Sequence, residues 1–208
     1  MIIGLDISTS ITGITVLDKK GTIVLNEAWD LRKYKDFFHK ADYVNEQIRS
    51  FHKKITLQPK YLSHRNAVGI SKEVNVPLAT PIMLDPFNEV EAIYIEQSLQ
   101  SFRSGFSSAK TLSTLSRFNG VVSWMCYQNF NIMPEYIAAT SARKKCGIKI
   151  PKGTKAKKVV LQHVIDNVPE VSIVYTKHGN PKPECFDKAD SWVVAQAGYL
   201  CQKEKNLE

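Results

Sequence analysis

Three short apolar segments joined by tight turns fill the first thirty residues, and they constrain the fold more than any other feature. Residues 2–7 read IIGLDI and residues 12–17 read TGITVL, and both runs are typical of buried strands. The turn DKKG at 18–21 ends in the glycine that hairpin turns favour, and a third strand is expected at 22–29. The chain is therefore expected to begin with an antiparallel meander.

Strands and helices alternate in the rest of the chain. Helices are expected at residues 35–55, 107–130, 155–168 and 184–203, and strands at 91–97 and 131–140. Pro134 lies in the last strand, which should form a sheet edge because proline lacks the amide donor. Residues 56–90 contain four of the nine prolines and little periodicity, so they are interpreted as an irregular insertion. The pattern predicts one α/β domain over 1–208: a five-stranded mixed sheet, its first three strands antiparallel, with helices on both faces.

Charge is distributed unevenly along the chain. The 28 Lys and Arg residues outnumber the 20 Asp and Glu residues, so the net charge is +8. Residues 141–158 alone contain eight Lys or Arg and no acid. Such a cluster binds a phosphate backbone by releasing counterions, and a solvated basic loop is the alternative interpretation.

Other features indicate the compartment. No apolar run approaches the ~20 residues that a membrane span needs, so no membrane association is expected. The start, MIIGLDIST, lacks the basic region of a signal peptide. The four cysteines form no CxxC pair, which is typical of reduced thiols in a bacterial or infected-host cytoplasm.

Four carboxylates lie near the ends of expected elements. Asp6 and Glu96 lie in apolar strands. Asp187 and Asp190 are three positions apart near the start of the helix expected at 184–203, so they lie on the same face of it. Taken singly, Asp6 could bond a loop and Asp187 could cap its helix. If all four converge, they repel one another unless a cation lies among them, and such oxygen ligands select Mg²⁺ or Mn²⁺. Two such ions can activate a water and stabilise the leaving oxygen in phosphodiester cleavage.

The chain resembles the RuvC Holliday-junction resolvases of the RNase H-like superfamily in three motifs. Asp6 is followed seven positions later by a glycine that a threonine precedes, in TG at 12–13. An apolar strand ends in IEQ at 95–97, and DKAD at 187–190 opens an apolar helix rich in small residues. The order and coarse spacing of the elements match over most of the chain. The family usually has Pro-Gly after its first aspartate, where this chain has Ile7-Ser8.

This resemblance implies an RNase H-like fold and a crossover junction endodeoxyribonuclease that resolves four-way DNA junctions and leaves 5′-phosphate ends. It implies two Mg²⁺ ions per site, with Mn²⁺ as a substitute, held by Asp6, Glu96, Asp187 and Asp190. It also implies a homodimer, because a junction presents two equivalent strands. The insertion at 56–90 indicates a divergent branch, of phage or viral type.

The resemblance also implies basic and aromatic contacts to DNA. Arg143 and Lys157 fall where the family keeps active-site lysines, and Lys144 and Lys155 remain open alternatives. The family's aromatic residue after its second motif is absent here, so Phe102 or Phe106 would replace it. The residues expected to contact DNA are Arg143, Lys144, Lys145, Lys149, Lys152, Lys155, Lys157, Lys158, Phe102 and Phe106.

Three other functions compete with junction resolution. Another RNase H-like nuclease, acting on flaps, forks or RNA–DNA hybrids, would use the same acids. An actin-like ATPase or sugar kinase also opens with an aspartate-bearing strand, but its phosphate loop needs a glycine where Ser8 stands, and 208 residues cannot supply its two domains. A non-catalytic DNA-binding protein would have no use for four repelling carboxylates.

Overall fold

The computed structural model describes residues 1–56, 90–97 and 109–207. The expected insertion at 56–90 therefore falls almost entirely outside the described residues, as do Phe102 and Phe106. The strands are β1 (Ile2–Asp6), β2 (Ile11–Leu17), β3 (Ile23–Asp30), β4 (Ala92–Glu96) and β5 (Glu135–Ile137). The helices are α1 (Phe37–Thr56), α2 (Ala109–Phe130), α3 (Ala139–Lys145), α4 (Ala156–Asn167) and α5 (Pro183–Lys205).

The five strands form one mixed sheet in the order β3-β2-β1-β4-β5. The β1–β2 and β2–β3 pairs are antiparallel, whereas β1–β4 and β4–β5 are parallel. The predicted meander and the predicted edge position of β5 are both confirmed. The turn after β2 closes through a hydrogen bond from the Gly21 amide to the Asp18 carbonyl, and Gly21 has the positive φ of 84° that favours glycine there.

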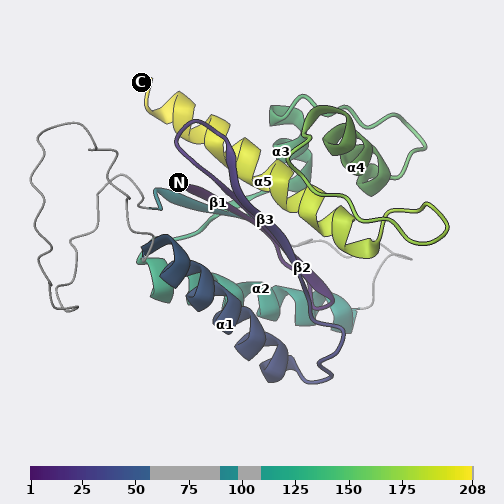
Figure 1. Ribbon diagram of the computed structural model, residues 1–208. Coiled ribbons are helices and arrows are strands. Elements are labelled where there is room, and N and C mark those ends of the chain that lie inside the picture. The colour runs from purple at the N-terminus through teal and green to yellow at the C-terminus, as the bar shows by residue number, and fades with distance from the viewer. Residues whose placement is uncertain (57–89, 98–108, 208) are drawn as a thin grey trace, which may run out of the picture.

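Helices cover both faces of this sheet, with α1 and α2 on one face and α5 on the other (Figure 1). Successive side chains of a strand point to opposite faces, so β1 serves two cores. Ile3 and Leu5 pack into the cluster that includes residues of α1 and α2. Ile2 packs instead with Val194 and Ala195 of α5. Asp6, an even-numbered residue of the same strand, therefore points to the α5 face.

Glycines let α5 lie directly on the sheet. A Cβ atom on Gly4 would be 2.2 Å from the backbone nitrogen of Ala195, and one on Gly13 would be 2.1 Å from the backbone oxygen of Asp187. Between these two close approaches, the Thr15 and Ser191 hydroxyls form a buried hydrogen bond of 2.9 Å. The position of α5 along the sheet is thus set at three points.

The strand predicted at 131–140 is wrong over most of its length. Only Glu135–Ile137 pair with β4, and α3 begins two residues later. The basic run at 141–158 therefore starts within a helix, α3, and not directly after a strand. The sequence ATSARKK is rich in good helix formers, and Ala142 is buried against the same core cluster as Val193. Tertiary packing of this small residue outweighs the weak strand pattern around it.

Two simpler expectations can also be checked. All four cysteines are free thiols, as their spacing predicted. Within the ranges that the structure describes, no helix is long and apolar enough to cross a membrane.

Candidate active site

Two of the four carboxylates end neighbouring parallel strands. Asp6 is the last residue of β1 and Glu96 is the last residue of β4. The residues just before them, Leu5 and Ile95, are register partners, so the two acids lie side by side. The strand alternation places Glu96, like Asp6, on the face that α5 covers.

The other two carboxylates lie at the start of α5. Asp187 and Asp190 fall in the first two turns of this helix, which begins at Pro183. The backbone of Asp187 lies against Gly13, and Gly13 is the register partner of Asp6 in the β1–β2 ladder. The close approach at Gly13 therefore brings the start of α5 to the end of β1.

Burial perturbs all four acids, and repulsion within the group perturbs three of them. Burial, and then the charges of Glu96 and Asp190, raise the pKa of Asp6 well above its usual value. Burial, and then the charge of Asp190, raise the pKa of Glu96 to about 7. Burial also raises the pKa of Asp187 and of Asp190. The cluster therefore carries more buried negative charge than its surroundings neutralise.

Lys157 supplies positive charge to this cluster. Its Nζ lies 3.3 Å from Asp187 Oδ1 and 3.3 Å from Asp190 Oδ2. Burial lowers the pKa of Lys157, but the charges of Asp6, Asp190 and Asp187 outweigh burial and raise it. The second residue of α4 is thereby tied to the start of α5.

Arg143 of α3 is the other cation near the acids. Its charge lowers the pKa of Glu96 and of Asp190, opposing the effect of burial. Its Nε donates a hydrogen bond of 2.8 Å to the Ala139 carbonyl, one turn back along α3. Lys157 thus contacts two of the acids and Arg143 acts electrostatically on two of them, whereas no ion pair among the described residues joins Lys144 or Lys155 to any of the four acids.

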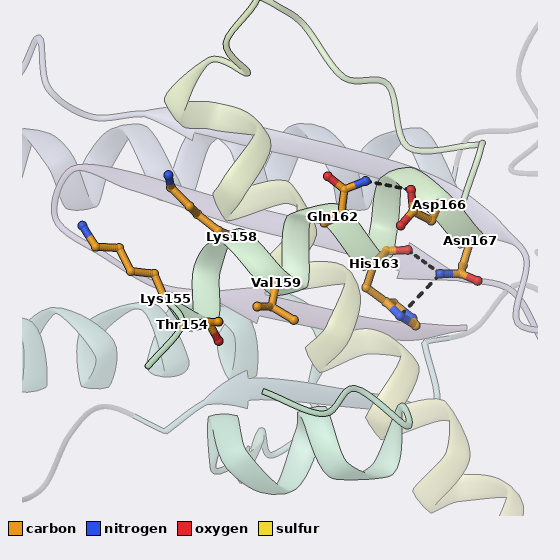
Figure 2. Close-up of a pocket in the computed structure, with 8 residues that line it drawn as sticks. All are labelled: Thr154, Lys155, Lys158, Val159, Gln162, His163, Asp166 and Asn167. Carbon is orange, nitrogen blue, oxygen red and sulfur yellow. Dashed lines mark hydrogen bonds between the residues drawn. The ribbon is translucent and has the colours of Figure 1, made fainter. Parts of the chain in front are cut away.

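The remaining basic residues spread over α3, α4 and their connection. Lys144 and Lys149 line a shallow hollow of about 280 Å³ that Arg143 also borders. Lys155 and Lys158 border a second hollow on α4 and extend away from His163, as Figure 2 shows. Lys152 is exposed in the connection between α3 and α4.

Lys145 is placed differently from the others. Its Nζ lies 2.6 Å from Glu204 Oε2, near the carboxyl end of α5. Glu204 is 17 positions after Asp187 on the same helix, or about 25 Å at 1.5 Å per residue. Lys145 therefore faces the opposite end of α5 from the acids.

The donor set suits a hard divalent cation. Asp6, Glu96, Asp187 and Asp190 offer only carboxylate oxygens, which Mg²⁺ and Mn²⁺ prefer. In the described ranges, no three His, Cys, Asp or Glu side chains are already arranged as a metal-ligand group. An ammonium, that of Lys157, lies between two of the acids instead. The chemistry of the residues fits the ion: burial raises their pKa values first, and repulsion between their charges, which a cation would neutralise, adds to this for Asp6, Glu96 and Asp190.

Sequence reasoning missed two supporting contacts. Asn119 of α2 is buried and its Nδ2 donates to the backbone oxygen of Glu96 at 3.3 Å. The sequence does hold a sign of this contact, because the amide side chain of Asn119 lies next to Phe118 on the apolar face of α2. Arg32 Nη2 lies 2.7 Å from Glu184 Oε1, in the first turn of α5. No local pattern reports this pair, because its members are far apart in sequence.

Comparison with known proteins identifies the fold. No protein-family model matches the chain, and no curated protein matches it. The structure of T. thermophilus RuvC in complex with a Holliday junction substrate matches with a TM-score of 0.58 at 10% identity, covering 98% of this chain and 94% of that chain. A further structure of Thermus thermophilus RuvC matches with a TM-score of 0.55 at 11% identity, covering 98% and 96%. The predicted fold class is confirmed: this chain has the RNase H-like fold of RuvC.

Proposed function

We propose that this chain is a Mg²⁺-dependent endonuclease that resolves four-way DNA junctions and leaves 5′-phosphate ends. One observation carries the proposal: two strand-end acids, Asp6 and Glu96, meet two acids of α5 on one face of a RuvC-like sheet. The T. thermophilus RuvC that shares this fold was solved with a Holliday junction substrate. The proposal extends this substrate to the present chain.

The four acids and two cations would have separate tasks. Asp6, Glu96, Asp187 and Asp190 would hold two Mg²⁺ ions, which when bound supply an activated water and stabilise the departing 3′ oxygen. Arg143 and Lys157 would neutralise charge on the scissile phosphate. The exposed lysines of α4 and of the connection before it would track the DNA backbone.

The proposed active form is a homodimer of one nuclease domain per chain, residues 1–208, with an insertion at about 56–90. A twofold dimer would place one site on each of the two equivalent strands of a junction. It should nick opposing strands at symmetric positions. A linear duplex should be bound through its charge but cut poorly, because it cannot engage both sites.

The test is cleavage of an end-labelled four-way junction compared with flap, fork, duplex and RNA–DNA substrates of the same sequence. Paired symmetric nicks in the junction, at a rate well above that on the other substrates, are expected. Faster degradation of hybrids, forks or flaps would favour another RNase H-like nuclease. Mg²⁺ binding with no cleavage of any substrate would contradict both.

A further inference from the structure

Lys157 links α4 to the start of α5, where two of the proposed metal ligands lie. Its ammonium contacts Asp187 Oδ1 and Asp190 Oδ2 at equal distances of 3.3 Å. The two carboxylate side chains are 11% and 14% exposed, whereas the Lys157 side chain is 60% exposed. The acids are thus held in the fold, while the lysine reaches them from the solvent side.

The ammonium stabilises an otherwise repulsive group. Asp190 raises the pKa of both Asp6 and Glu96, and Lys157 lowers both. Taking the ammonium away would leave neighbouring buried carboxylates facing one another. Lys157 therefore acts as an internal counter-ion in the arrangement that the structure shows.

A divalent cation would need the same oxygens. Mg²⁺ binds carboxylate oxygens at about 2.0–2.1 Å. An ammonium in contact with those oxygens competes with the ion, both by occupying the approach and by like-charge repulsion. We propose that Lys157 is an exchangeable counter-ion, displaced from Asp187 and Asp190 when the metal binds and then free to bind a DNA phosphate. This inference rests on the metal site of the proposed function.

The position of Lys157 on α4 indicates what its ammonium would bind after leaving the acids. It lies between Lys155 and Lys158 at the exposed, basic start of α4. An ammonium freed from the acids would join these two lysines in contacting the backbone. Because linkage is reciprocal, metal binding should then strengthen DNA binding by the factor by which DNA strengthens metal binding.

The experiment compares two single-charge removals on the same helix. Lys157→Met removes the counter-ion and keeps most of the side-chain length. Lys158→Met removes the same charge one residue later, and the ion pairs with Asp187 and Asp190 are those of Lys157, not of Lys158. Mg²⁺ binding is measured by titration calorimetry without DNA. Lys157→Met should bind Mg²⁺ roughly 3- to 10-fold more tightly than wild type, and Lys158→Met should stay within about twofold.

Two further measurements separate competition from a merely structural role. Metal-free Lys157→Met should melt at a lower temperature than wild type, and Mg²⁺ should restore more of its stability. With Ca²⁺ as a second oxygen-seeking probe, the ion should strengthen four-way junction binding by a smaller factor in Lys157→Met than in Lys158→Met.

Equal Mg²⁺ affinity in the two variants would overturn the counter-ion proposal and leave the nuclease proposal intact. A wild-type protein and variants that all fail to bind Mg²⁺ would overturn both.

Discussion

Replacing Gly13 by alanine would put a methyl carbon 2.1 Å from the backbone oxygen of Asp187 and 2.7 Å from its carbonyl carbon. Ordinary contact between such atoms is about 3.5 Å, so the deficit exceeds 1 Å. Neither neighbour is the flexible end of a side chain, because both belong to the helix backbone. The first turns of α5 would therefore have to move away from β2.

This displacement should affect both stability and catalysis. Overpacking of this kind costs about 1–3 kcal/mol, and occasionally more. For a chain of this size, that loss lowers the melting temperature by roughly 3–10 °C. Asp187 moves with its backbone, and a misplacement of about 1 Å at a reacting centre can reduce turnover roughly 100-fold. Gly13→Ala should therefore lose about two orders of magnitude in junction cleavage at a temperature where it is fully folded.

Two other glycines provide matched controls. The added carbon in Gly4→Ala would also collide with α5, because it would lie 2.2 Å from the backbone nitrogen of Ala195. This collision is eight residues, or about 12 Å, beyond Asp187 along the helix. Gly4→Ala should lose comparable stability and much less activity. Gly120→Ala, where nothing described lies within 4 Å of the added carbon, should be neutral or stabilise α2 by up to about 1 kcal/mol.

The assays are urea unfolding and single-turnover cleavage of a labelled four-way junction in Mg²⁺. If Gly13→Ala cleaves within about threefold of Gly4→Ala while both are folded, the close approach at Gly13 does not position Asp187. A Gly13→Ala protein with wild-type stability would refute the packing argument itself.

Three further predictions test the acids and the basic segment. Asp6→Asn should abolish junction cleavage, retain binding and not lower the metal-free melting temperature, because it relieves repulsion; near-wild-type turnover would refute its catalytic role. The pKa of Glu96 is raised from 4.5 to about 7 in the folded protein, so the metal-free protein should gain stability as the pH falls from about 7 towards 4.5. Glu96→Gln should flatten that profile in thermal unfolding, and an unchanged profile would assign it to other groups. Neutralising Lys152, Lys155 and Lys158 together should reduce the log–log salt slope of junction binding by about three units, whereas an unchanged slope would mean a solvated face.

Local patterns predicted the elements that carry strong periodicity. The meander, β4 and the helices α1, α4 and α5 all lie within a few residues of their expected ranges. The segment at 131–140 failed because a three-residue strand and a seven-residue helix share it, and neither is long enough to show its own period. Residues this close to an element boundary take their conformation from what packs on them, here the burial of Ala142.

The candidate site shows the same division. The apolar surroundings of Asp6 and Glu96 marked both acids as unusual, since an isolated buried carboxylate is costly. That Lys157, and not Lys155, contacts Asp187 and Asp190 depends on the direction that each side chain takes at the start of α4. Lys155 is the residue before α4 and Lys157 is its second residue. Residues two positions apart on a helix differ by about 200° in direction, and a run of lysines carries no signal of this difference.

The sequence by itself determined which chemical groups the chain carries: four acids on apolar elements, a basic segment, and glycines at positions 4 and 13. It determined the meander as well, because turn residues and strand alternation act over a few positions. Only the tertiary structure decided that α5 lies on β1 and β2, that Gly13 meets Asp187, and that Lys157 bridges Asp187 and Asp190. These contacts join residues that are 30 to more than 170 positions apart. Their formation depends on how whole faces pack, and packing selects partners by shape and burial rather than by any local pattern.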